Sequence, residues 1–144
     1  MAQNGGTKPI PVLLALLVCD VAVADPSTGK KNLIGIFDKV FVAKFPTARQ
    51  ASLYIKLTDA LGRYGLLIEF VHSNKSAKLG EAKGEFMASS ALESVDAYVP
   101  FPPLPIPEPG RYEFRLFADS VYLGSAFIDA VAASYPVTPP EEKK

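Results

Sequence analysis

The most regular pattern in the chain is an alternation of apolar and polar residues within 110–131. From Tyr112 to Leu116 every second residue is apolar, and the residues between them are charged. A period of two places the apolar side chains on one face of an extended strand. Asp119 and Ser120 supply a polar turn, after which residues 121–131 form a second β-rich run. This region is therefore predicted to be an antiparallel β-hairpin with one buried face.

Upstream of this hairpin, further short segments have the composition of strands, and turn residues separate them. The segment Asp25–Lys30 is the clearest turn, because Pro26 restricts φ, Gly29 permits a left-handed residue and the Asp25 side chain can cap the turn. No segment shows a helical period. The predicted strands cover residues 12–24, 32–42, 51–58, 64–72, 78–87, 92–99, 110–118 and 121–131.

About eight short strands predict an all-β fold, a single antiparallel β-sandwich of jelly-roll or immunoglobulin-like kind. We assign residues 1–11 to a flexible lead-in, 12–133 to the sandwich domain and 134–144 to a solvated tail. The apolar face of each strand predicts the core, which comprises Leu13, Leu17, Ile34, Ile36, Leu53, Ile55, Leu57, Leu66, Ile68, Phe70, Tyr112, Phe114 and Leu116.

The segment Phe101–Pro109 is rich in proline. Proline cannot donate to a strand ladder, so we interpret the segment as a stiff connection between the two sheets. The alternative is a polyproline II helix that serves as a ligand for an aromatic groove.

Composition limits the functional classes. The chain has 144 residues, 49% of them hydrophobic, with 15 basic and 15 acidic residues. A net charge of zero argues against nucleic-acid binding. With one Cys and one His, neither an intramolecular disulfide nor a zinc site of the Cys/His type can form. We predict no cofactor.

The apolar run Val12–Cys19, followed by Ala22-Val23-Ala24, has two interpretations. It could be a signal peptide with a small-residue cleavage site, or a core strand of the mature domain. Its β-branched residues favour the strand. The run is too short to span a membrane. We therefore predict a cytoplasmic protein with an intact N-terminus, no membrane association and a reduced Cys19 that faces the core.

Candidate chemistry is limited to carboxylates and one histidine. If the first two strands pair, Asp20 and Asp38 lie nearly opposite one another and need a cation or a shared proton between them. Together with Asp25 they could form a Ca²⁺-type oxygen site; alternatively, they are ordinary structural carboxylates. His72 has no nucleophile in a recognised setting and is predicted to form local hydrogen bonds at a strand end. We predict that the protein is not an enzyme.

Several of these residues also carry a resemblance. The chain is similar to a bacterial family of uncharacterised small domains over about Leu13–Val131. The resemblance implies a cytoplasmic β-sandwich, a domain of unknown function, and brings no activity with it. It rests on Cys19-Asp20, Asp25 with Thr28-Gly29-Lys30, Leu33-Ile34-Gly35-Ile36-Phe37-Asp38, Phe45-Pro46 and Pro109-Gly110-Arg111-Tyr112.

These observations predict a non-catalytic binding or structural module that acts through sheet edges or loops. Its partner would be a protein or a second copy in a homo-oligomer, and the apolar strands Val12–Ala24 and Val121–Val131 would be the contact edges. The alternative is a small-ligand or Ca²⁺-type metal-binding β-sandwich that uses Asp20, Asp25 and Asp38.

Overall fold

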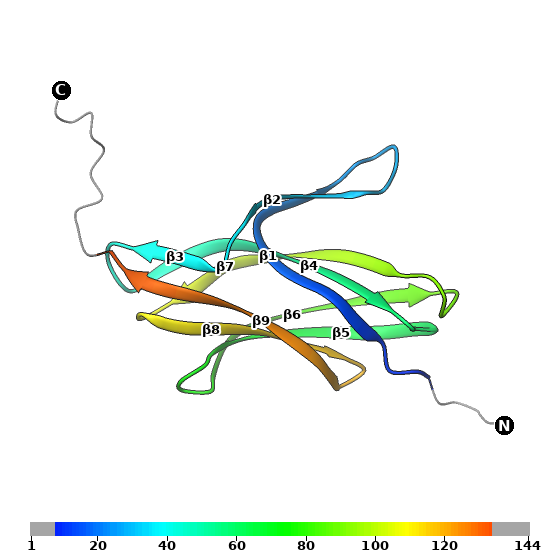
Figure 1. The fold of residues 1–144 in the computed structure, drawn as a ribbon. Coiled ribbons are helices and arrows are strands. Elements are labelled where there is room, and N and C mark those ends of the chain that lie inside the picture. The colour runs from blue at the N-terminus through cyan, green and yellow to red at the C-terminus, as the bar shows by residue number, and fades with distance from the viewer. Residues whose placement is uncertain (1–7, 134–144) are drawn as a thin grey trace.

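Two packed β-sheets make up the protein (Figure 1). The structure is a computed structural model that describes residues 8–133. One sheet has the order β2-β1-β4-β7, and the other has the order β3-β9-β8-β5-β6. The predicted all-β antiparallel sandwich is confirmed. The strands are β1 (Val12–Ala24), β2 (Lys31–Ile36), β3 (Lys39–Val42), β4 (Thr47–Thr58), β5 (Gly62–His72), β6 (Ala77–Ala88), β7 (Val95–Ile106), β8 (Gly110–Ala118) and β9 (Val121–Ala132).

The predicted strand 32–42 is divided between the two sheets. It ends in the first sheet at Ile36 and restarts in the second sheet at Lys39. The Phe37 N–H donates to the carbonyl of Val18 at 3.0 Å, and the carbonyl of Asp38 accepts from the Asp129 N–H at 2.8 Å. The chain thus crosses between sheets within two residues. As a result β3 pairs with β9 in parallel, whereas the other strand pairs are antiparallel.

The proline-rich segment was wrongly predicted to be a connection, because most of it belongs to strand β7. Proline is tolerated there since β7 is the last strand of its sheet and needs no donors on its outer side. Pro100 stands opposite Ser52 of β4 and Pro105 stands opposite Ala48. The short connection to β8 is Pro107–Pro109.

The core lies between the two sheets and confirms most of the prediction. The predicted residues of β4, β5 and β8 are all buried, and Leu13 is half-buried and packs against them. Leu17, Ile34 and Ile36 were wrongly assigned to the core, and Ile34 and Ile36 are 57% and 58% exposed.

A β-bulge explains the error in β1. The register with β4 shifts between Leu13 and Ala15, so that Leu16 stands opposite Ile55 and Val18 stands opposite Leu53. The even-numbered residues after the bulge therefore point into the core, and Leu17 points outward. Ile34 and Ile36 pair with Val21 and Cys19 of β1, so they face the same outer side.

The described part of the predicted lead-in contacts the sandwich. The Lys8 ammonium group forms an ion pair with Asp119 at 2.6 Å, and the carbonyl of Pro9 accepts from the Tyr64 hydroxyl at 2.7 Å. Residues 1–7 and the predicted tail, 134–144, lie outside the described residues. Residues 8–133 contain no helix that is long and apolar enough to cross a membrane.

Candidate functional site

Two strand edges lack a neighbour at the same side of the sandwich. Strand β2 pairs with β1 only from Cys19 to Ala24, and β3 pairs with β9 only from Asp129 to Ala132. Within the described residues, the stretches Val12–Leu16 of β1 and Val121–Phe127 of β9 therefore have no strand beside them on that side. Free edges of this kind present unpaired backbone groups to any chain that approaches.

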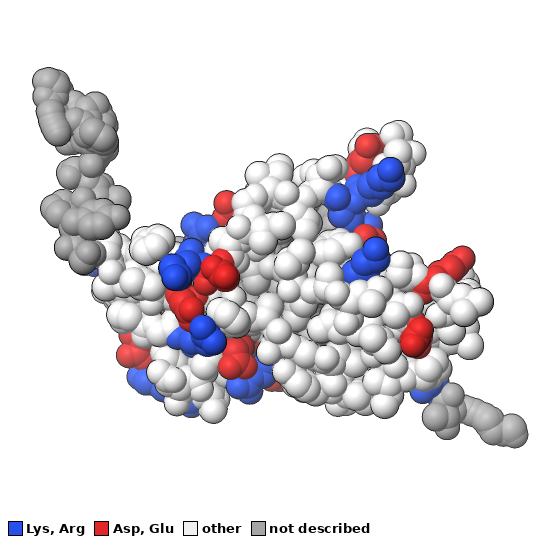
Figure 2. Space-filling model, in the orientation of Figure 1, with Lys and Arg blue, Asp and Glu red and all other residues white. Residues whose placement is uncertain are grey.

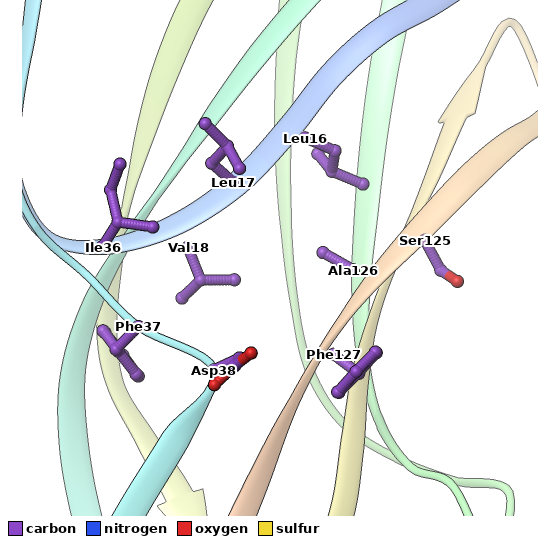
Figure 3. A pocket seen from close by; sticks show the side chains of 9 residues that line it. All are labelled: Leu16, Leu17, Val18, Ile36, Phe37, Asp38, Ser125, Ala126 and Phe127. Carbon is purple, nitrogen blue, oxygen red and sulfur yellow. The ribbon is translucent and has the colours of Figure 1, made fainter.

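Between the two edges lies a cavity of about 380 Å³, which we call the notch. Figure 3 shows its three walls, formed by β1, by the crossover from β2 to β3, and by β9. Asp38 is the single charged residue among those that line it. The lining residues are Leu16, Leu17, Val18, Ile36, Phe37, Asp38, Ser125, Ala126 and Phe127.

The backbone groups that face the notch follow from the hydrogen bonds at its closed end. The N–H groups of Asp129 and Ala133 donate to carbonyls of the β3 segment, both at 2.8 Å. Because alternate residues of a strand direct their backbone groups to the same side, Phe127 and Ser125 direct their N–H and C=O groups to the free edge of β9. On β1, the Val18 carbonyl accepts from Phe37 at 3.0 Å, so the backbone groups of Leu16 face the free edge too.

The side chains along these edges are apolar and exposed. Val12 and Leu14 of β1 and Val121, Tyr122 and Phe127 of β9 are all exposed. Figure 2 shows charged side chains gathered toward the ends of the molecule, with an uncharged area over β1 and β9 between them. An uncharged free edge is unusual for a strand that faces only water.

Arg111 and Asp129 hold Phe127 in position at one rim. The Arg111 guanidinium lies over the Phe127 ring, 3.7 Å from its centroid, and donates to both Asp129 oxygens at 2.8 and 3.1 Å. These hydrogen bonds keep the pKa of the Asp129 carboxyl below its usual range. At this rim, an exposed aromatic ring therefore packs against a cation that is itself paired with a carboxylate.

The predicted opposition of Asp20 and Asp38 is wrong. The turn Asp25–Lys30 closes with Ala24 opposite Lys31, which places Asp20 beside Gly35, three residues short of Asp38. The sequence could not fix this register, because it depends on where the turn closes. Asp20 instead accepts from Arg49 at 2.6 Å, and Arg49 lies over the Phe37 ring, 4.4 Å from its centroid.

The three predicted metal ligands occupy three different settings. Asp20 pairs with Arg49, Asp38 lines the notch, and Asp25 accepts from the backbone N–H and the hydroxyl of Ser27 at 2.8 and 2.9 Å. The Ser27 hydrogen bonds lower the pKa of Asp25. Residues 8–133 contain no group of three or more His, Cys, Asp and Glu side chains that could hold a metal ion.

His72 is buried at the end of β5, contrary to the predicted local hydrogen bonding. Its ring packs against Tyr112 with centroids 4.6 Å apart, and neither ring nitrogen has a hydrogen-bond partner. Glu108 approaches Nε2 to 3.3 Å but also pairs with Lys75 at 2.5 Å. The His72 ring lies beside Gly110, at the start of β8.

Sequence reasoning identified the two strands of the notch but not the residues that line it. Phe37 lay inside a segment predicted to be one continuous strand, 32–42, and Ser125 lay inside the second strand of the predicted hairpin. One signal was available: residues 121–128 contain no Lys and no Pro, the residues that commonly protect a strand edge.

The fold and the notch define a β-sandwich with an open, apolar edge. The profile of a family described as a family of unknown function, DUF6941, matches residues 14–130, and the chain belongs to that family. This confirms the resemblance at the level of a family without an assigned function.

No curated protein matches the chain. Among solved structures it is similar to the CARDB domain of the PF1109 protein from Pyrococcus furiosus, which was crystallised in complex with di-metal ions. The two chains are 14% identical, and the TM-score is 0.37 over 90% of this chain and 95% of that chain. Similarity at this level carries no argument about function.

Proposed function

We propose that the protein is a non-catalytic binding module that takes an extended segment of a partner protein as an added strand at the notch. One observation carries the proposal: two free, apolar strand edges border the same cavity, and neither is blocked by Lys or Pro. In strand addition, backbone hydrogen bonds supply affinity and pockets for alternate side chains supply specificity.

The lining of the notch indicates the chemistry of the partner segment. Its alternate side chains would enter a space lined by Leu16, Val18 and Ala126, which favours small or medium apolar residues. Asp38 at the crossover favours a Lys or Arg at that end of the segment. The backbone of the partner would pair with Ser125 and Phe127 of β9.

No step in this function is catalytic, and it uses neither a metal nor a cofactor. The proposal includes the bacterial, cytoplasmic setting that the resemblance implies. Support for an intact N-terminus comes from the position of β1, which pairs with both β2 and β4. Removal of residues 1–24 would delete this strand and expose the core. The intact mass of the native protein tests this point, since a chain that begins at Asp25 contradicts it.

Selection of peptides from a random displayed library on the purified protein tests strand addition. We expect the enriched peptides to alternate apolar residues and to carry a basic residue near one end. On binding, the Ser125 and Phe127 amides should become protected from hydrogen exchange.

A matched pair of variants separates strand addition from side-chain docking. Ser125→Ala keeps the backbone donor and should bind the selected peptides as the wild type does. Ser125→Pro removes the backbone donor that faces the free edge and should weaken binding more than about tenfold. The urea midpoint of this variant shows whether the φ restriction that proline imposes also affects the fold. Equal binding by both variants, or a selection that enriches no peptide, would contradict the proposed function.

A further inference from the structure

The free edge of β9 stops where β3 begins. The first residue of β3 stands opposite Asp129, and the Asp38 carbonyl accepts from the Asp129 N–H at 2.8 Å. One residue earlier the chain has left this edge, because the Phe37 N–H donates to a carbonyl of β1 at 3.0 Å. The backbone at Asp38 therefore occupies the position beside Ile128, and the first free position on the edge lies beside Phe127.

A strand that adds to this edge cannot continue in a straight line past Phe127. The backbone groups on one side of a strand pair with a single neighbour, and β3 already pairs with β9 from Asp129 to Ala132. A segment from the interior of a partner chain would have to bend sharply out of the sheet at this point. A segment whose chain begins or ends here has no further residues to place. The edge therefore favours a chain end over an internal segment.

The charge at this end of the notch decides which chain end fits. Asp38 is the single charged residue that lines the notch, and Figure 3 shows its side chain directed from the crossover toward Phe127. The Asp38 carboxylate is exposed and has no ion-pair partner within residues 8–133, since Arg49 and Arg111 are each paired with another aspartate, at 2.6 and 2.8 Å. A carboxylate attracts the α-ammonium group of a polypeptide and repels its α-carboxylate.

We propose that the notch binds the free amino terminus of a partner polypeptide, with the α-ammonium group at Asp38 and the following residues paired to β9. The inference rests on the strand addition proposed above and specifies which segment of the partner is taken. With its amino end at Asp38, the added strand runs antiparallel to β9, which is the slightly more stable ladder per residue. Capture of a terminal amine is an established mode of peptide recognition.

The backbone of Phe127 suits such a terminus. Its N–H and C=O groups both face the free edge, so in an antiparallel pair they exchange two hydrogen bonds with the residue directly opposite. If that residue is the first of its chain, its nitrogen is an ammonium group with three donors at neutral pH. One donor bonds to the Phe127 carbonyl, and another is available to the Asp38 carboxylate. An internal amide has a single N–H and forms only the bond to Phe127.

The same register assigns the first side chains of the partner. Directly opposite residues of an antiparallel pair point to the same face of the sheet. The first residue therefore lies beside the exposed Phe127 ring, in water, and the second stands opposite Ala126 and enters the notch. That space is lined by Leu16, Val18 and Ala126, so we expect a small or medium apolar residue at the second position and little restriction at the first.

Two displayed peptide libraries, selected on the full chain, test the inference. In one library the random segment begins at a free amino terminus, and in the other a fixed Gly-Ser-Gly precedes it. We expect enrichment from the first library, with an apolar second residue. Synthetic peptides of the enriched sequences should bind more than about tenfold more weakly once acetylated, because acetylation removes the charge and adds atoms where β3 blocks the edge.

Asp38→Asn and Glu93→Gln form a matched pair of variants. Each removes one exposed carboxylate, and Glu93 lies in the loop between β6 and β7, outside the notch. Asp38→Asn should weaken binding of the free-amine peptide about threefold, as expected for an exposed ion pair, and should leave binding of the acetylated peptide unchanged. Glu93→Gln should bind both peptides as the wild type does. Asp38→Asn keeps the backbone carbonyl that accepts from Asp129, so its urea midpoint should not change much.

The outcomes separate this inference from strand addition itself. Equal enrichment from both libraries, with the Ser125 and Phe127 amides protected from hydrogen exchange, overturns the capture of an amino terminus and leaves strand addition in place. Equal binding of free and acetylated peptides has the same consequence, and so does an Asp38→Asn variant that binds as Glu93→Gln does. Enrichment from neither library overturns both proposals.

Discussion

The strand edges on the two sides of the sandwich differ in their residues. At the side of β6 and β7, the edge of β7 carries Pro100, Pro102, Pro103 and Pro105, and β6 carries charged residues such as Lys78 and Glu81, which pair at 2.6 Å. At the side of β1 and β9, the free edges are apolar and uncharged. Proline and charge are the usual means by which natural sheets prevent unwanted pairing.

This difference indicates that the open edge is tolerated for a reason. The same chain that protects one side with four prolines leaves the other side without a single proline or lysine along 121–128. Both sides rest on the same core, so stability does not explain the asymmetry. We attribute the asymmetry to the proposed strand addition at the open side. The following predictions test the contrast, from the largest expected effect to the smallest.

The largest expected effect is a difference in unfolding free energy between a core substitution, Phe114→Ala, and an edge substitution, Phe127→Ala. Phe114 is fully buried and contacts Phe70 and Phe101 with ring centroids 5.0 and 5.5 Å apart. Phe114→Ala should lower the free energy of unfolding by about 3–5 kcal/mol because it leaves a cavity. Phe127→Ala at the edge should cost only about 1 kcal/mol. Urea unfolding measures both, and similar losses would mean that Phe127 is structural.

Gly35, in β2 at the open side, has a backbone conformation that residues with a side chain rarely adopt. Its φ is +71°, and a Cβ there would collide with the Asp20 carboxylate. Gly35→Ala should therefore lower the free energy of unfolding by about 1–3 kcal/mol. In an Asp20→Gly background, which already lacks the 2.6 Å ion pair with Arg49, Gly35→Ala should cost less because the collision is absent. An equal cost of Gly35→Ala in both backgrounds would show that backbone strain alone is responsible.

Replacing prolines of β7 should leave the edge of this strand able to pair with another strand, as the free edges of β1 and β9 are. Pro102 and Pro103 are exposed, and replacing both by Thr should cost about 0.4–1 kcal/mol at each position through the entropy of the unfolded chain. The variant should also aggregate faster than the wild type, because its edge can now pair. Light scattering at a fixed concentration follows this. An unchanged aggregation rate would weaken the explanation of why β7 is proline-rich.

The Arg111–Asp129 pair at the rim of the notch should make the stability of the fold depend on pH. The Arg111 hydrogen bonds lower the pKa of Asp129 in the folded protein, so its contribution to stability is complete above the unfolded value of about 3.9 and is lost as the pH falls through the folded pKa. Asp129→Asn should therefore lose less stability than the wild type between neutral pH and pH 3. Both groups are partly exposed, so the difference should be small. Urea midpoints at both pH values measure it.

The smallest expected effect is that of calcium. Asp20 is engaged by Arg49 and Asp25 by its own turn, so millimolar Ca²⁺ should leave the thermal midpoint unchanged. A ligand that binds only the folded state must raise the midpoint. A rise that is lost in Asp38→Asn would instead support the metal-binding alternative.

Much of the fold could be predicted from the sequence because it depends on local periodicity. The alternation in β4, β5 and β8 identifies their buried faces, and Leu53, Ile68 and Phe114 all lie in the core as predicted. Turn residues mark most strand boundaries. These features need only neighbouring residues, since side-chain direction in a strand has a period of two.

Other features depend on contacts between distant segments, and only the tertiary structure decided them. The bulge after Leu13 reverses which residues of β1 face inward, and the closure of the turn at Lys31 places Asp20 beside Gly35. The crossover at Phe37 and Asp38 sends one predicted strand into two sheets. Register and strand order are set by pairing partners that the sequence does not name, and a shift of a single residue exchanges the two faces of a strand. For that reason the sequence determined which segments are strands, whereas the tertiary structure decided that two of their edges meet at a notch.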